Sequence, residues 1–163
     1  MRIAKRRRRE FKTDYKARFS LLKSGLLRLV VRKTDHYLIA HIVASKEAQD
    51  STIVYANSKE LSKFGWPLNP KNLAAAYLSG FLLGKKYLKN NKKPGKLILD
   101  SGLQRSTKES RIYGVVKGVV DAGVEVLCDS KMFPKQERIN MEYKNKKIKE
   151  LLENVKKEIE KNA

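Results

Sequence analysis

The sequence has few of the residues that build disulfides, metal centres and nucleophilic active sites. It contains one cysteine, Cys128, and two histidines, His36 and His41. A single cysteine cannot form an internal disulfide, and these three residues do not have the spacing of a zinc site. Neither histidine has a serine or cysteine partner with an orienting acid. We therefore predict no metal, no cofactor and no hydrolytic triad.

Long apolar runs are missing as well. The longest, residues 73–83, is too short to span a bilayer. The apolar residues that follow the basic N-terminus are interrupted by charges, unlike those of a signal peptide. An arginine-rich start is also typical of organelle transit peptides, but the helix expected behind it leads directly into a strand and leaves no obvious cleavage site. We expect a cytoplasmic protein without a membrane partner.

Acidic residues are scarce. The 163 residues include 37 Lys and Arg against 17 Asp and Glu, which gives a net charge of +20. Self-repulsion at this charge favours a polyanionic partner; nucleic acid fits best, and an anionic membrane surface is the alternative. Residues 1–33 contain 13 Lys or Arg, with Glu10 and Asp14 as their only acids. This distribution predicts a basic arm that binds a polyanion.

The apolar pattern behind the arm predicts a helix and then an antiparallel meander. The helix covers residues 13–24 and ends at Gly25, and we expect Tyr15, Phe19 and Leu22 to anchor the arm to the domain. Runs rich in Val, Ile and Tyr predict three strands, over residues 27–33, 37–45 and 51–58.

Two crossover helices complete the predicted sheet. The first starts at Asn69 and Pro70 and leads to a strand over residues 96–100. The second starts with a capping box of Ser106 and Glu109, ends at Gly123 and leads to a strand over residues 124–128. Right-handed crossovers place these strands parallel to their neighbours. The expected fold is α/β, a mixed five-stranded sheet with helices packed on it.

Both crossover helices contain glycines at a spacing of four, Gly80 with Gly84 and Gly114 with Gly118. Glycine lowers helix stability, so this spacing indicates a close backbone, either of another element or of the domain's own sheet. Residues 142–163 predict an amphipathic helix that packs on the domain or on a partner. The chain thus divides into an arm (1–12), an α/β domain (13–140) and a C-terminal helix (141–163).

The predicted strand order has ribonuclease H-like topology, and nucleases of that fold hold two metals on acidic residues. The first strand here has no acid, and Asp100 has no second carboxylate placed to share a metal. We therefore predict no enzyme activity. A nuclease and a general basic DNA-binding protein remain the alternatives to an RNA-binding protein.

Two strands place basic and aromatic residues on shared faces. Alternation puts Arg28 and Arg32 on one face of the first strand, and Tyr37, Ile39, His41 and Val43 on one face of the second. If these faces coincide, they can hold phosphates and stack on unpaired bases. The alternative is that Arg28 and Arg32 are only solvated.

Several segments resemble the archaeal and eukaryotic branch of a ribosomal protein family, the large-subunit protein eighteen of bacterial naming, which binds 5S ribosomal RNA. They are "RRRRE", "KTDY", "RLVVRKT", "NLAAAYLSGFLLG", "LILDSGLQRSTKESRIYGVVKGVVDAGVEV" and "FPKQERI". The resemblance runs in order from residue 5 to about residue 140. It implies a ribonuclease H-like domain without catalytic acids and no DNA partner. The implied partners are 5S rRNA, the large-subunit rRNA and neighbouring ribosomal proteins of the central protuberance.

The resemblance also implies which residues contact RNA. In the arm and the following helix these are Arg6, Arg7, Arg8, Arg9, Lys12, Thr13, Tyr15 and Arg18. Around the first strand they are Lys23, Ser24, Arg28, Arg32 and Lys33, to which the strand faces add Tyr37 and His41. In the loop "GLQRSTKES" and just after it they are Gln104, Arg105, Thr107, Lys108 and Arg111. The sequence departs from the family at Phe11, where a small residue is usual, and at Glu109, where glycine is common.

Overall fold

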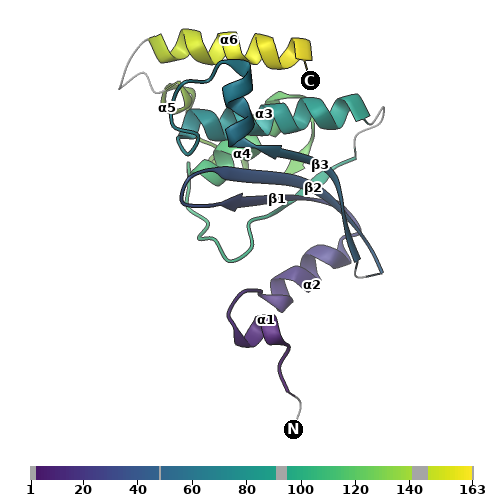
Figure 1. Ribbon diagram of the computed structural model, residues 1–163. Coiled ribbons are helices and arrows are strands. Elements are labelled where there is room, and N and C mark those ends of the chain that lie inside the picture. The colour runs from purple at the N-terminus through teal and green to yellow at the C-terminus, as the bar shows by residue number, and fades with distance from the viewer. Residues whose placement is uncertain (1–2, 48, 91–94, 141–146, 163) are drawn as a thin grey trace.

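The computed structural model describes residues 3–47, 49–90, 95–140 and 147–162. One sheet separates helices α3, α4 and α6 on one side from the N-terminal helices α1 and α2 on the other (Figure 1). Its strands are β1 (Leu27–Lys33), β2 (Leu38–Lys46), β3 (Gln49–Asn57), β4 (Leu97–Asp100) and β5 (Val126–Leu127).

The strands run in the order β3-β2-β1-β4-β5. β1 pairs antiparallel with β2, and β2 with β3, whereas β4 lies parallel to both β1 and β5. Helix α3 (Leu73–Asn90) connects the meander to β4, and α4 (Arg111–Asp121) connects β4 to β5. The predicted mixed five-stranded sheet is therefore confirmed. β5 is shorter than predicted.

The two crossover helices begin later than predicted. Asn72 caps α3, because its side chain accepts a hydrogen bond from the Ala75 amide at 2.7 Å. Asn69 instead forms a turn by accepting from the Lys71 amide. The capping box of Ser106 and Glu109 is wrong, because Glu109 has a φ of 57° and Ser110 is the N-cap of α4. A left-handed residue cannot belong to the first turn of a right-handed helix.

The glycines of α3 and α4 let these two helices touch through their backbones. A Cβ on Gly80 would lie 2.0 Å from the Val115 carbonyl oxygen, and one on Gly118 would lie 2.1 Å from the Tyr77 carbonyl oxygen. The close backbone indicated by the glycine spacing is thus that of the other crossover helix rather than that of the sheet.

Replacing Gly118 by alanine should therefore destabilise the protein. Alanine is the better helix former by about 1 kcal/mol, but the added methyl group meets backbone and forces the helices apart, at a typical cost of about 3 kcal/mol. We expect urea unfolding to show a net loss of about 2 kcal/mol in the free energy of unfolding. Gly114→Ala is the matched control, because the closest atom to its methyl group would be the movable side-chain end of Leu73, and its other neighbours lie at ordinary contact distance. Equal midpoints for the two variants would contradict the backbone contact.

Helix α6 (Lys147–Asn162) packs on the domain. Of the two predicted locations for its apolar stripe, the domain or a partner, the structure shows the domain. Ile148, Leu152, Val155 and Ile159 are buried against α3 and the short helix η1 (Ser58–Phe64). Residues 141–146 and 163 of the predicted C-terminal segment, and residues 1–2 of the arm, lie outside the described residues. The domain boundaries at residues 12 and 140 stay a prediction.

Candidate nucleic-acid interface

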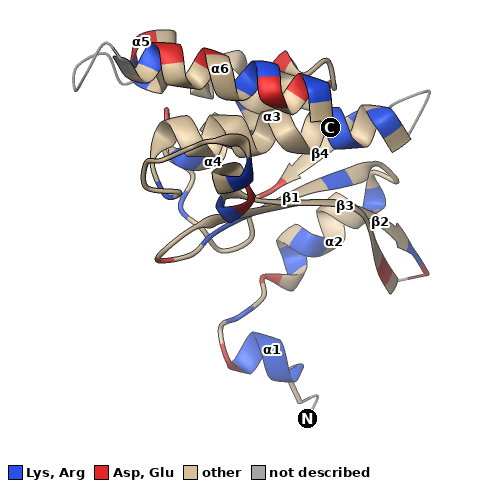
Figure 2. Cartoon of the chain, turned by 45° about the horizontal axis from the view of Figure 1, so that its top comes forward, with Lys and Arg blue, Asp and Glu red and all other residues tan. Residues whose placement is uncertain are grey.

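The N-terminal arm is rich in Lys and Arg and extends away from the sheet (Figure 2), and its described residues up to Lys12 are exposed. Helix α1 (Arg6–Arg9) is one turn of four arginines with no buried residue. Glu10 is the arm's one carboxylate and lies 2.9 Å from Lys12 and 3.7 Å from Arg6. Arg7 donates to the Thr13 hydroxyl at 2.8 Å. One acid cannot neutralise so many cations, so the arm keeps a strongly positive potential.

Phe11 turns the chain between α1 and the next helix. Its φ of 51° lies in the left-handed region that favours glycine, and its side chain is 87% exposed. The positive φ explains why a small residue suits position 11, because a side chain hinders this backbone conformation. It also puts an apolar ring into solvent beside the arginines.

Helix α2 (Tyr15–Lys23) is not anchored as predicted. It begins at Asp14, whose side chain accepts from the Lys16 and Ala17 amides, but it contains no buried residue. Phe19 is 63% exposed, so its predicted anchoring role is wrong, while Tyr15 and Leu22 are half-buried. The apolar spacing predicted the helix correctly, but spacing does not determine whether a surface covers it.

A polar contact joins α2 to the sheet instead. Arg18 donates to Asp50 at 2.7 Å, and Asp50 also accepts from Arg28 at 2.6 Å. Arg28 continues to Asp100 at 3.0 Å, and Asp100 pairs with Arg32 at 2.8 Å. These five residues, here called the charge chain, run from the arm helix across β1 to the end of β4.

Arg28 is the centre of this chain and is only 2% exposed. The prediction that Arg28 and Arg32 both face solvent or RNA is wrong for Arg28, whose guanidinium is buried between Asp50 and Asp100. Sequence alternation placed Arg28 correctly on the same face of β1 as Arg32 but could not supply its two acidic partners. Arg32 is half-buried and also donates to the Asp100 carbonyl at 2.6 Å.

The charge chain predicts an acid-sensitive arm. Partial burial works to raise the pKa of Asp50, but hydrogen bonds from Ser45, Arg18 and Arg28 outweigh it and lower the pKa to about 2. Because this pKa lies below the ordinary value of 3.8, the stabilisation is complete above that value and is lost as the pH falls towards 2. Asp50→Asn should mimic the loss at neutral pH and speed tryptic cleavage within α2. Asp35→Asn, at an exposed position, is the control, and equal cleavage rates would contradict the role of Asp50.

The open face of the sheet carries an aromatic pair. His41 and Tyr55 face each other on β2 and β3 with ring centroids 4.9 Å apart. Burial and then the charge of Arg32 lower the pKa of His41, so its ring is neutral at physiological pH. Tyr37 lies beside this strand beneath the Lys59 ammonium, 4.3 Å from the ring centroid. Tyr55 was not predicted, although the alternation of β3 could have placed it on this face.

Val43 lies on the same face of β2 as Ile39 and His41, as predicted, because the pairing with β1 sets Val43 opposite Arg28 without a register shift. It is nevertheless buried. The irregularity lies in the pairing with β3, where Ile42 pairs with Val54 and Val43 with Thr52, so that Ile53 of β3 is the extra residue. Only Tyr37, Ile39 and His41 of the predicted set are partly exposed.

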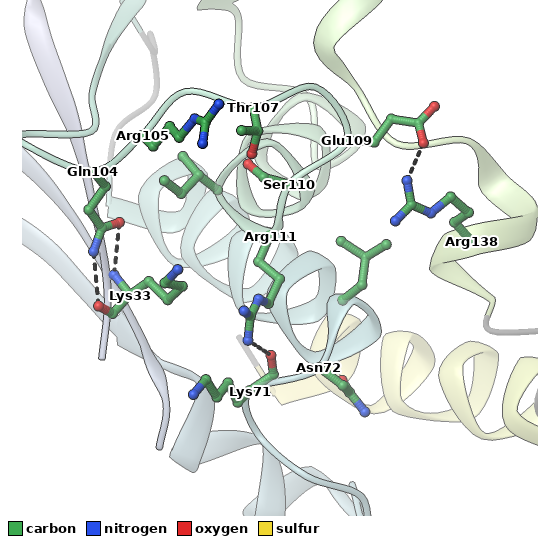
Figure 3. Close-up of a pocket in the computed structure, with 12 residues that line it drawn as sticks. Lys33, Lys71, Asn72, Gln104, Arg105, Thr107, Glu109, Ser110, Arg111 and Arg138 are labelled. Atoms are coloured by element: carbon green, nitrogen blue, oxygen red, sulfur yellow. Dashed lines mark hydrogen bonds and ion pairs between the residues drawn. The ribbon is translucent and has the colours of Figure 1, made fainter. Parts of the chain in front are cut away.

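The loop after β4 forms one wall of a cavity of about 600 Å³ (Figure 3). Gln104 ties this loop to β1, because it accepts from the Lys33 amide at 3.2 Å and donates to the Lys33 carbonyl at 2.9 Å. Arg105 and Thr107 are exposed beside it, and Arg111 donates to the Lys71 carbonyl at 3.1 Å. The loop thus holds its basic residues around a defined hollow.

Glu109 does not add an unpaired negative charge to this loop. Its carboxylate forms an ion pair with Arg138, and its amide donates to the Met132 carbonyl at 3.0 Å. Its positive φ explains why glycine suits the position. Sequence analysis missed Arg138 and Lys71, because both are distant in the chain from the loop they face.

The predicted RNA-binding residues therefore fall into three groups. The arm group contains Arg6, Arg7, Arg8, Arg9, Lys12, Thr13, Tyr15, Arg18, Lys23 and Ser24. The sheet group contains Arg28, Arg32, Lys33, Tyr37 and His41, and the loop group contains Gln104, Arg105, Thr107, Lys108 and Arg111. Ser24 caps α2 by donating to the Leu21 carbonyl, and Lys23 lies over the Phe19 ring. Gln104 links the sheet group to the loop group.

Asp100 is not part of a metal centre in the described chain, because both its oxygens accept from arginines. No group of three or more His, Cys, Asp or Glu residues gathers within residues 3–47, 49–90, 95–140 and 147–162. None of the helices described there has the length and hydropathy to cross a membrane. The domain therefore combines a basic arm, an aromatic sheet face and a basic loop. These features are typical of the class of proteins that bind nucleic acid.

Comparison with known proteins gives the family. Residues 1–94 and 88–129 match the family of ribosomal large subunit proteins 60S L5 and 50S L18. The large ribosomal subunit protein uL18 of Korarchaeum cryptofilum is 48% identical over 140 residues, which cover 85% of this chain and 70% of the relative. The uL18 proteins of Methanothermobacter thermautotrophicus and Methanococcus maripaludis are 43% and 45% identical, over 86% and 85% of this chain and 72% and 71% of the relatives.

The chain therefore belongs to the uL18 family. It is a large-subunit ribosomal protein of the cytoplasmic ribosome and not an enzyme.

Proposed function

We propose that this protein binds 5S rRNA and helps to attach it to the large-subunit rRNA in the central protuberance, beside neighbouring ribosomal proteins. The observation that carries the proposal is the exposed positive charge of the arm, whose residues line one hollow together with those of α2 and of the loop after β4. Arg6–Arg9 carry four cations near a single carboxylate, Glu10, and none of them is buried. Such a surface suits a folded RNA, because its phosphates form a higher density of negative charge than those of a single strand.

The three groups of residues have different roles in this proposal. Arm cations contact phosphates, which positions the protein without reading sequence. Tyr37 and His41 offer rings to unpaired bases on the open sheet face, and Tyr55 joins them. Arg28 is left out as an RNA contact, because its guanidinium is buried and paired with two carboxylates.

Sequencing the RNA that co-purifies with the tagged protein from cells tests the proposal. We expect 5S rRNA to be enriched over transfer and messenger RNA, with large-subunit rRNA fragments as the second class. In vitro, 5S rRNA should bind more tightly than a duplex DNA of equal length at the same salt concentration. Equal affinities would support a general basic DNA-binding protein instead.

A further inference from the structure

We propose that Asp50 is a two-position latch, which holds helix α2 through Arg18 in the free protein and moves one carboxylate oxygen onto the buried Arg28 when an anion takes Arg18. The anion is a phosphate of RNA, and in this respect the inference rests on the proposed function. The latch itself lies within the protein and can be tested without RNA. Its three members come from separate elements, α2, β3 and β1.

Asp50 divides its two carboxylate oxygens between two arginines. Its Oδ1 accepts from Arg28 Nη2 at 2.6 Å and from the Ser45 hydroxyl at 2.5 Å, whereas its Oδ2 accepts from Arg18 Nη2 at 2.7 Å. The ion pair with Arg18 is partly open to water, because the two side chains are 34% and 32% exposed. An anion from solution can therefore compete for Arg18, but not for Arg28, whose side chain is 2% exposed.

Arg28 has a buried donor that the observed arrangement leaves empty. Its Nη1 donates to Asp100 at 3.0 Å, and its Nη2 donates to Ser45 and Asp50. Its Nε is buried and has no hydrogen-bond partner within the described part of the chain. A buried donor without an acceptor is costly, and a planar guanidinium lets one carboxylate accept from Nε and a neighbouring Nη as a fork. The empty Nε is therefore a second position for the Oδ2 atom of Asp50.

The two positions of the carboxylate offset each other. In the first, α2 is docked and Arg28 Nε lacks an acceptor; in the second, α2 loses its contact with Asp50 and Nε gains one. Release of Arg18 therefore costs less than breaking an isolated ion pair. Helix α2 contains no buried residue, so few apolar contacts oppose its movement. The latch also draws the Asp50 charge towards a buried cation, away from the phosphate that it would repel.

The alternative is a fixed bridge, in which Asp50 holds its place whether or not Arg18 is bound. The test follows the Arg28 Nε–H signal in ¹H–¹⁵N spectra of the full chain, because a proton that gains an acceptor moves downfield. Arg18→Gln frees the Oδ2 atom of Asp50 and should move this signal downfield. Lys16→Gln is the matched control, an exposed lysine of the same helix with the same change in charge, and should leave the signal in place.

A second background identifies the group that moves. Combined with Asp50→Asn, the Arg18→Gln change should no longer shift the Arg28 Nε–H signal, because asparagine has only one oxygen to offer. A shift that persists without the carboxylate would mean that Asp50 is not the moving group. An Arg28 signal in Arg18→Gln equal to that of the Lys16→Gln control would show a fixed bridge. Either result would overturn the latch.

The natural trigger can be added in the same experiment. Titration of 5S rRNA into the wild type should move the Arg28 Nε–H signal in the direction seen for Arg18→Gln, whereas sodium chloride at equal ionic strength should move it less. RNA that binds without moving the signal would show that Arg18 stays on Asp50 and would overturn the proposed trigger. RNA that fails to bind would refute only the proposed function, because the variant spectra would still decide whether the latch exists.

Discussion

Replacing Arg6–Arg9 with alanine should flatten the salt dependence of RNA binding by about three units of log–log slope. Each arginine that meets a phosphate displaces condensed counterions, and each lost contact removes roughly 0.7 to 0.9 from the slope. The four side chains project from a one-turn helix that has no buried residue, so their removal leaves the folded domain intact. Affinities measured by fluorescence anisotropy over a series of salt concentrations would give the slope.

The loss should apply to every RNA tested, because phosphate contacts do not read sequence. Preference for 5S rRNA over a simple hairpin should partly survive, since the sheet face and the loop after β4 stay intact. A matched control replaces four exposed lysines distant from the arm with alanine: Lys63, Lys89, Lys149 and Lys157. If the arm and control variants give the same slope, net charge alone explains the effect. An unchanged slope in the arm variant would mean that the arm binds something other than RNA.

Asp100→Ala should cost about 3–5 kcal/mol of stability, the largest loss expected from a single substitution here. The substitution leaves the Arg28 guanidinium buried with one of its two carboxylate partners missing, and it frees Arg32 as well. Arg28 keeps Asp50 and Ser45 as partners, but a buried charge that loses part of its compensation is more costly than an absent pair. Urea unfolding followed by circular dichroism would measure the loss.

Two further variants separate this explanation from simple loss of packing. Asp35→Ala removes an exposed carboxylate and should change the free energy of unfolding by less than about 0.5 kcal/mol. Arg28→Met combined with Asp100→Leu removes both charges and should be more stable than Asp100→Ala alone. RNA affinity of Asp100→Ala, measured well below its unfolding temperature, should stay close to that of the wild type. An Asp100→Ala protein as stable as Asp35→Ala would show that Arg28 does not need this partner.

The sequence pattern was sufficient to predict those features of the fold that depend on residues close together in the chain. The run of residues 27–33 predicted β1 without error, because its composition and alternation are properties of a short segment. The small residues of α3 and α4 indicated a close backbone because glycine in a helix has a cost that packing must offset. The basic arm was evident from charge alone, since solvent-exposed charge needs no tertiary partner.

Sequence by itself thus determined the order of the elements, the mixed sheet, the uneven charge and the family. Only the tertiary structure decided that Arg28 is buried, because its partners Asp50 and Asp100 are 22 and 72 positions away in the chain. It also decided that α2 is held by Arg18 rather than by Phe19, and that Lys71 and Arg138 face the loop after β4. Burial and ion pairing depend on which distant segments meet, and a pattern within one segment contains no information about its neighbours in space.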